Sequence, residues 1–275
     1  MRADRIAFAG VVTVLVAWSL GPAVWQLLTA LKPDNQIARY PVVYLPRPAT
    51  LEHFFALWSR KPFGAYLLNS ALVALGATAI CLAAAFPGAA ALARMAGRTR
   101  DAVLLLLLGL ALFPPVLLLF PLYEGVRALG WINRPEGLVL PYAAFNLPLA
   151  VWVLESAFRS LPRELDEAGR LDGLSVVGRI RRIQAPLVAP SAATAAILVF
   201  VFSWNEFMLA LTFLTRDTSK TVTAGIASVG GASLYEIAWG QLSAATVFAT
   251  VPLVVLVLFF QRRIVSGLTR GGVKG

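Results

Sequence analysis

The sequence is poor in charged residues, histidine and cysteine, and each shortage excludes a class of protein. Asp, Glu, Lys and Arg make up 14% of the 275 residues, whereas soluble domains carry about 25%. The chain therefore has too few polar side chains to cover a soluble globule. A single cysteine, Cys81, excludes an internal disulfide framework, and its apolar surroundings favour a small packing residue. The single histidine, His53, leaves no His-x3-His or similar metal-ligand spacing.

Long hydrophobic runs take the place of polar sequence. Hydrophobic residues make up 59% of the chain, and the mean hydropathy is +0.75. Six stretches are long enough to cross a hydrocarbon layer of about 30 Å, which takes about 20 helical residues. Each is expected to be a helix, because lipid offers backbone groups no other hydrogen-bond partner. The predicted spans are 6–31, 63–93, 102–123, 137–154, 183–205 and 237–261, with kinks expected at Pro87, Pro114–Pro115 and Pro148.

The lysines and arginines all fall outside these spans, so their distribution predicts the orientation of the chain. Fifteen lie on the side that holds both termini and the loops 94–101 and 155–182, and nine lie on the other side. Because Lys and Arg are enriched in cytoplasmic loops, both termini are predicted to be cytoplasmic. The first apolar run exceeds the ~7–15 residues of a signal peptide, so we expect it to remain as a membrane helix. The net charge of +10 then reflects topology, and no nucleic-acid-binding face is required.

Two long loops differ in character. Residues 32–62, on the predicted outer side, contain five prolines and predict an extended segment with a short helix around Leu51–Trp58. The cytoplasmic loop 155–182 is densely charged. Within it, Pro162 suits the first turn of a helix, acidic residues follow at the positive end of the helix dipole, and Gly173 is a natural terminator. A single apolar stripe, which a surface helix lying against the membrane-helix ends would explain, is formed by Leu161, Leu165, Ala168 and Leu171.

The spacing that follows this helix is more specific. Glu167-Ala168-Gly169, three residues, Gly173, nine residues and then Ile183-Gln184-Ala185-Pro186 resembles the EAA motif of ABC importer permeases, with Gly169 in place of the second Ala and Ala185 in place of Leu. In that family the motif forms the coupling helix, which sits in a cleft of a cytoplasmic ATPase subunit. The resemblance implies an ATPase-coupling role for Glu167, Ala168, Gly169, Asp172, Gly173 and Pro186.

The end of the fifth span, Ser203-Trp204-Asn205-Glu206-Phe207, combines an aromatic ring with hydroxyl, amide and carboxylate groups. That mixture suits a sugar, whose C–H faces stack on rings while its hydroxyls need donors and acceptors. The stretch also resembles a segment of carbohydrate-type permeases. An acid near the membrane interior is costly, so Glu206 is a candidate for the substrate pathway, although it could equally bond a neighbouring helix. Weaker pathway candidates are Asn69 and Asn146, each also suited to an interhelical hydrogen bond.

The last residues, Gly267-Leu-Thr-Arg-Gly-Gly-Val-Lys-Gly275, resemble the C-terminus of the shorter permease subunit of maltose/trehalose-type importers. In those systems this tail reaches between the ATPase subunits, and the outer loop that corresponds to the surroundings of Gly225 meets the binding protein. The resemblance implies a type I ABC importer fold, all-α with six transmembrane helices, as a single permease domain over residues 1–275. It implies a multi-pass location in a bacterial or archaeal cell membrane.

The implied partners are a second permease subunit that completes a heterodimer, two cytoplasmic ATPase subunits, an extracytoplasmic sugar-binding protein and membrane lipid. No cofactor is expected on the chain itself, because it has no Gly-x4-Gly-Lys-Ser/Thr phosphate loop, and ATP is expected on the ATPase subunits. An enzyme embedded in the membrane is disfavoured, because intramembrane acids are too few for a paired-carboxylate site. The resemblance implies an ATP-driven importer for a carbohydrate such as maltose or trehalose, and a permease for glycerol-phosphate or another small polar solute is the alternative. An ATP-independent carrier is a further alternative, which the EAA-like loop disfavours.

Overall fold

The computed structural model describes residues 2–230 and 237–269, and all regular structure in this part of the chain is helical. Five helices are long and apolar enough to cross a membrane, and a bent helix pair raises the number to six if it counts as one span. The five long helices are α1 (Arg2–Ala30), α4 (Phe63–Leu92), α7 (Val139–Arg159), α10 (Ala185–Asn205) and α13 (Trp239–Thr269).

The third predicted span is a bent pair of helices, and the break falls at the Pro114–Pro115 pair, where a kink is expected. Helix α5 (Gly97–Leu112) ends before Pro114, and the chain resumes as a 3-10 turn (Pro115–Leu118) and α6 (Leu119–Ala128), bent by 82° from α5. Two consecutive prolines remove two N–H donors and push the residue before each out of the helical region. Phe113 and Pro114 are accordingly extended, with ψ values of 128° and 117°.

Helices α4, α7 and α10 form the centre of the bundle, where α4 contributes a stripe of small buried residues. Small side chains at intervals of four residues let two membrane helices approach closely, so that packing replaces the missing hydrophobic driving force. Cys81 belongs to this stripe and is buried, which confirms its prediction as a small packing residue. The stripe consists of Val73, Ala77, Cys81, Ala85 and Ala89.

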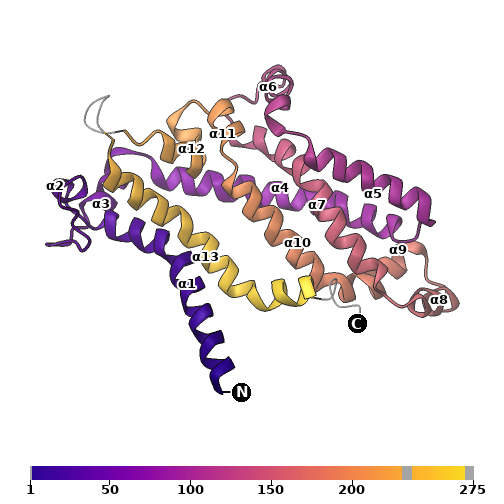
Figure 1. Cartoon of the computed structure of the whole chain (residues 1–275). Helices are drawn as coiled ribbons and strands as arrows, with labels where there is room; N and C mark the ends of the chain where they lie inside the picture. The colour runs from indigo at the N-terminus through magenta and orange to yellow at the C-terminus, as the bar shows by residue number, and fades with distance from the viewer. Residues whose placement is uncertain (1, 231–236, 270–275) are drawn as a thin grey trace.

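Helix α1 leaves the bundle along much of its length. Its C-terminal part packs on α13, while its N-terminal part points away from the other helices (Figure 1). None of its most apolar window is buried within the chain, and Trp18 is 83% exposed. Such an apolar face requires a cover of lipid or of another membrane helix, because water solvates it poorly.

Short helices mark the two ends of the bundle. The start of α1, the end of α13, α8 (Arg163–Leu171) and α9 (Val176–Arg179) lie toward one end, hereafter the α8 end (Figure 1). Four short helices lie toward the opposite end, hereafter the α3 end. The prediction of a helix around Leu51–Trp58 is confirmed by one of them, α3. These four helices are α2 (Asp34–Ile37), α3 (Glu52–Arg60), α11 (Met208–Phe213) and α12 (Val222–Ala227).

The long loop predicted at 155–182 is mostly helical. Helix α7 continues to Arg159, and the helical segment that leads into α10 already begins at Val176, seven residues before the predicted start of the fifth span. Arginine has a good helix propensity, so a membrane helix need not end where the apolar run ends. The C-terminal motif falls partly on residues 270–275, which lie outside the described residues.

Candidate functional site

Helix α8 has the start and the end that its sequence predicts. Pro162 precedes the helix, Glu164 and Asp166 lie in its first turn, and Arg170 lies in its last. Gly173 then adopts a φ of +75°. The Gly173 N–H donates to the Arg170 carbonyl and the Leu174 N–H to the Gly169 carbonyl, both at 3.0 Å. This pair of bonds is the Schellman arrangement, in which glycine at positive φ closes a helix, and it confirms Gly173 as the terminator.

The residues of α8 divide into an outward and an inward face, and the predicted apolar stripe does not lie on one of them. Leu161 and Leu165 are half-buried, whereas Ala168 is exposed and Leu171 is 90% exposed. Glu167 and Asp172 are also exposed. The outward face therefore presents small, apolar and acidic groups together.

Gly169 faces inward, and its missing side chain has a packing reason. It is buried, and a Cβ at this position would lie 2.7 Å from Cδ1 of Ile183 and 3.1 Å from Cγ and Cδ of Arg179. The alanine of the family motif would therefore displace both side chains. Glycine lowers the helix propensity at this position, but it lets α8 lie closer to the chain that leads into α10.

Asp166 is the main inward-facing charge of α8, and the sequence predicts for it only a favourable place at the positive end of the helix dipole. Its Oδ1 accepts hydrogen bonds from Arg179 Nε at 2.9 Å, Arg94 Nη2 at 3.1 Å and Gln184 Nε2 at 3.3 Å. Burial opposes its ionisation, but the hydrogen bond from Arg179 and the charges of Arg94, Arg179 and Arg170 outweigh that effect and hold the pKa of Asp166 below its usual value. Only the i,i+4 pair with Arg170 is visible in the sequence.

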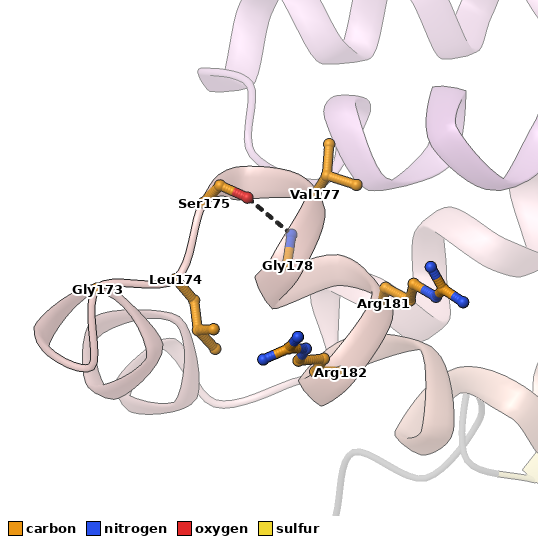
Figure 2. A pocket seen from close by; sticks show the side chains of 7 residues that line it. All are labelled: Gly173, Leu174, Ser175, Val177, Gly178, Arg181 and Arg182. Carbon is orange, nitrogen blue, oxygen red and sulfur yellow. Dashed lines mark hydrogen bonds between the residues drawn. The ribbon is translucent and has the colours of Figure 1, made fainter.

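Next to α8, the chain forms a small open cavity of about 390 Å³ (Figure 2). Ser175 caps the start of α9, because its Oγ accepts from the Gly178 N–H at 3.2 Å. The cavity is lined by Gly173, Leu174, Ser175, Val177, Gly178, Arg181 and Arg182. Pro186 lies beyond it as the second residue of α10, which directly follows a π-helical turn (Ile180–Gln184). All six predicted coupling residues thus lie on α8, on the turn that ends it, or at the start of α10.

The predicted pathway residues of α10 point in different directions. Trp204 is buried, stacks on Phe200 at a centroid distance of 5.7 Å and donates from Nε1 to the Ala249 carbonyl of α13 at 3.2 Å. Asn205 is exposed and bonds the Val201 carbonyl of its own helix. These contacts give Trp204 a packing role against α13 and leave the Asn205 amide at the surface of this chain.

Glu206 lies where α10 ends, and its carboxylate joins three segments. It accepts hydrogen bonds from the Tyr142 hydroxyl of α7, and from the N–H groups of Leu209 at 3.0 Å and Ala210 at 3.2 Å in the first turn of α11. Its carbonyl accepts from Thr223 Oγ1 of α12 at 2.8 Å. The structure therefore gives the Glu206 carboxylate three partners and its carbonyl a fourth, and it places Glu206 at the junction of α7, α10 and α11.

Asn146 lies close to this junction, whereas Asn69 does not. Asn146 Nδ2 donates to the Tyr142 carbonyl at 2.8 Å and reaches Ser203 Oγ of α10 at 3.5 Å. Asn69 Nδ2 instead donates to the carbonyls of Thr218 and Lys220, both at 3.0 Å. Of the five predicted pathway residues, Asn146 and Glu206 are thus brought together through Tyr142.

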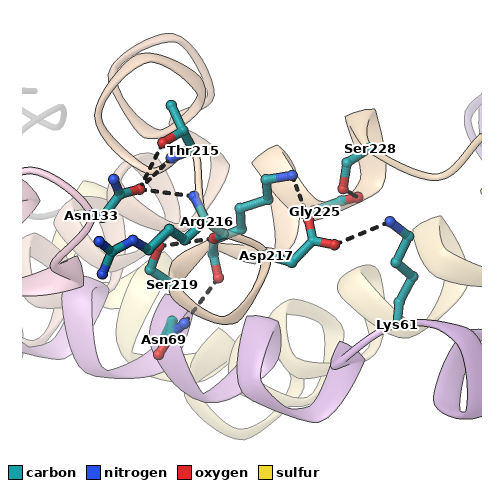
Figure 3. Close-up of polar contacts among 10 residues, drawn as sticks. Lys61, Asn69, Asn133, Thr215, Arg216, Asp217, Ser219, Gly225 and Ser228 are labelled. Carbon is teal, nitrogen blue, oxygen red and sulfur yellow. Dashed lines mark hydrogen bonds and ion pairs between the residues drawn. The ribbon is translucent and has the colours of Figure 1, made fainter.

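The segment that Asn69 holds forms a polar cluster at the α3 end (Figure 3). Asp217 accepts from Lys220 at 2.7 Å and Lys61 at 3.3 Å. Asn133, with a φ of 62°, accepts through Oδ1 from the N–H groups of Thr215 at 2.7 Å and Arg216 at 2.8 Å. Sequence reasoning missed Asn133 and the pair between Asp217 and Lys61, because these partners lie far apart in the chain.

Gly225 of α12 packs directly on a ring of α4. A Cβ at Gly225 would lie between 2.3 and 2.8 Å from three ring atoms of Tyr66, which is fully buried. Together with the bond from the Val222 N–H to Ser70 Oγ at 2.8 Å, this contact seats α12 on the start of α4. Helix α12 is therefore held in a defined position at the α3 end.

Long apolar helices joined by polar segments at both ends define a multi-pass helical membrane protein. The sequence family described as binding-protein-dependent transport system inner membrane component matches residues 62–270. The chain belongs to this family and is a permease subunit of the ABC-transporter type.

Curated relatives match along nearly the whole chain. The sulfoquinovosyl glycerol transport system permease protein SmoH of Agrobacterium fabrum is 38% identical over 96% of this chain and 92% of its own length. The trehalose/maltose transport system permease protein MalG of Thermococcus litoralis is 38% identical over 93% of this chain and 92% of its own. The trehalose transport system permease protein SugB of Mycobacterium tuberculosis is 35% identical over 100% of both chains.

Solved structures share the fold. A chain of a bacterial ABC transporter involved in the import of the acidic polysaccharide alginate superposes with a TM-score of 0.76, covering 95% of this chain and 98% of that one at 19% identity. A chain of the alginate transporter in complex with a pentasaccharide-bound periplasmic protein gives a TM-score of 0.67 at 16% identity, covering 95% of this chain and 94% of that one. At these identities the likeness concerns the fold alone.

Proposed function

We propose that this chain is one of two transmembrane subunits of an ATP-driven importer for a carbohydrate, and that it forms half of the translocation pathway. The observation that carries the proposal is α8, a nine-residue helix with EAA-like spacing. Its exposed face carries Glu167, Ala168 and Leu171, and its inward face is bonded to the bundle. The similarity to a trehalose/maltose permease and to a trehalose permease supports a carbohydrate as cargo.

In this proposal α8 is the coupling helix of the permease. Two ATPase subunits bind α8 and its counterpart on a second, similar permease subunit, and ATP hydrolysis takes place on those subunits. Closure of the ATPase pair pushes on Glu167, Ala168, Asp172 and the Gly173 turn, and the bundle changes from inward-facing to outward-facing. The exposed apolar face of α1 fits the second permease subunit or lipid.

The α3 end is the proposed docking face for the extracytoplasmic binding protein. The part of its last loop from Thr218 to α12 is held on α4 by Asn69, Ser70 and the contact between Gly225 and Tyr66, so a docked protein would press on a fixed surface. One fold neighbour, the alginate transporter, forms a complex with a pentasaccharide-bound periplasmic protein, which supports a partner of this kind. The excess of Lys and Arg on the α8 side supports a cytoplasmic position for that end.

The test is ATP hydrolysis by the reconstituted complex of this chain, the second permease and the ATPase subunits in liposomes. Binding proteins loaded with trehalose, maltose, sulfoquinovosyl glycerol or a glycerol-phosphate diester are added one at a time. We expect stimulation of hydrolysis, and solute uptake, with one of the two disaccharides. Stimulation by the glycerol-phosphate diester alone would favour the alternative cargo, and uptake by this chain without ATPase subunits would refute the importer.

A further inference from the structure

The inward face of α8 is held by a side-chain network centred on Asp166. A cavity of about 590 Å³ lies beside α8, and it is lined both by α8 and by the turn between α4 and α5. Helix α8 packs chiefly on α9 and on the π-helical turn. Across the cavity, the ion pair between Asp166 Oδ1 and Arg94 Nη2 at 3.1 Å joins α8 to the end of α4.

The other partners of Asp166 belong to the chain that becomes α10. Arg179 closes α9, and its side chain is only 8% exposed. Gln184 is the last residue of the π-helical turn and is buried. One carboxylate oxygen therefore connects α8 with the end of α4 and with the start of α10, which are two of the three central helices.

Arg179 also holds the far end of α8. Its Nη1 donates to the carbonyl of Leu174 at 2.9 Å, directly after the Gly173 turn, while its Nε donates to Asp166 in the first half of the helix. The stem of Arg179 lies against Gly169, where a Cβ would come within 3.1 Å of it. The glycine of the motif thus leaves room for an arginine that fastens both halves of the helix.

We propose that Asp166 is the positioning residue through which α8 moves together with α4 and α10, so that a push on the exposed face of α8 reaches the translocation pathway. A nine-residue helix is marginal on its own and needs a fixed support to transmit force. The inference rests on the proposed function, because it assumes that an ATPase subunit engages α8. The residues of the motif that face outward would contact the ATPase, whereas Asp166 faces inward and would pass the movement to the bundle.

The test compares three quantities in the full reconstituted complex: assembly with the ATPase subunits, the rate of ATP hydrolysis, and the amount of solute imported per ATP. Asp166→Asn keeps the shape of the side chain and removes its charge. We expect the complex to assemble and hydrolyse ATP while the solute imported per ATP falls by between about 2- and 30-fold, the range found for residues that transmit coupling. Asp166→Glu, which retains the charge, is expected to import more solute per ATP than Asp166→Asn and less than wild type.

Glu124→Gln on α6 is the matched control, because it also removes a carboxylate that pairs with an arginine, Arg127 at 3.4 Å. The control is expected to keep the wild-type ratio. If Asp166→Asn does not assemble, the solute imported per ATP is measured in Arg94→Gln instead. Arg94 is about a third exposed, and its loss leaves the bond from Arg179 to Asp166 in place. The inference is overturned if an assembled Asp166→Asn complex imports as much solute per ATP as wild type does. Where Asp166→Asn does not assemble, the same result in Arg94→Gln overturns it. A wild-type chain that neither binds the ATPase nor imports solute with it overturns the proposed function instead.

Discussion

At the scale of single residues, Gly173 shows how one backbone conformation ends α8, the proposed coupling helix. Its φ of +75° lies in the left-handed region, which costs a residue with a Cβ about 1–2 kcal/mol. Asparagine tolerates this region better than alanine does. The two hydrogen bonds that close α8 depend on this conformation, so a substitution here acts on the helix end and leaves the side-chain packing untouched.

We therefore expect Gly173→Ala to raise the opening of the last turn of α8 about five-fold, which corresponds to ~1 kcal/mol, and Gly173→Asn to have a smaller effect. Hydrogen exchange of the amides of Gly173 and Leu174 in the assembled complex measures it. Gly109→Ala in α5 is the control, because its Cβ would meet nothing within 4 Å. Equal protection in Gly173→Ala and wild type would contradict the explanation.

Glu206 illustrates how the structure changes the interpretation of an intramembrane acid. Its carboxylate accepts from Tyr142 and from two N–H groups in the first turn of α11, which would otherwise lack partners. A polar group left unpaired on burial costs about 1–3 kcal/mol. The loss of Glu206 should therefore affect the junction of α7, α10 and α11 more than the choice of solute.

Glu206→Ala is expected to lower the free energy of unfolding by at least about 1–3 kcal/mol, and Glu206→Gln by less, because its amide oxygen still accepts. Thermal unfolding of the purified chain in detergent measures the loss, and a double-mutant cycle with Tyr142→Phe isolates the bond between the two side chains. The order in which sugars stimulate the complex should stay the same. A changed order with unchanged stability would instead place Glu206 in the substrate pathway.

At the scale of the elements, the attachment of α8 depends on an ionised Asp166. Because the pKa of Asp166 is lowered in the folded chain, the attachment is fully present above the unfolded pKa of about 3.9 and is lost as the pH falls through the lower, folded value. We expect the difference in stability between wild type and Asp166→Asn to stay constant from about pH 8 to pH 5 and to shrink below about pH 4. Thermal unfolding at several pH values measures it, and a difference that disappears near pH 6 would contradict the ion network.

Two other elements show how far local sequence determines a shape. The Pro114–Pro115 pair predicts a break, but the bend of 82° between α5 and α6 also depends on how α6 packs at the α3 end. The stripe of Leu161, Leu165, Ala168 and Leu171 predicts one buried face, yet Leu171 is 90% exposed. Helical spacing places residues on a common face, but it does not say how much of that face a neighbour covers.

At the scale of the whole molecule, the orientation in the membrane is a prediction from the distribution of Lys and Arg. Ser59 and Ser160 provide a matched pair to test it. Each is exposed and bonds a carbonyl of its own helix three residues back, Ser59 at the α3 end and Ser160 at the α8 end. The native Cys81 is buried and contributes little background labelling.

In intact cells, a membrane-impermeant thiol reagent is expected to label Ser59→Cys and to spare Ser160→Cys. Inverted vesicles, in which the cytoplasmic side faces the reagent, should give the opposite result. Cell breakage in detergent, which exposes both sites, is the control for reactivity. Labelling of Ser160→Cys in intact cells would reverse the orientation.

The sequence by itself determined that the chain is a bundle of membrane helices, because lipid leaves the backbone no alternative. It also determined that a short helix precedes Gly173 and that Gly173 ends it, since both depend on neighbours within a few residues. Only the tertiary structure decided what each polar side chain does. Asp166 meets Arg94 across 72 positions of sequence, and Asn69 meets Lys220 across 151. Such contacts depend on how the helices pack, which residue spacing along one helix does not specify.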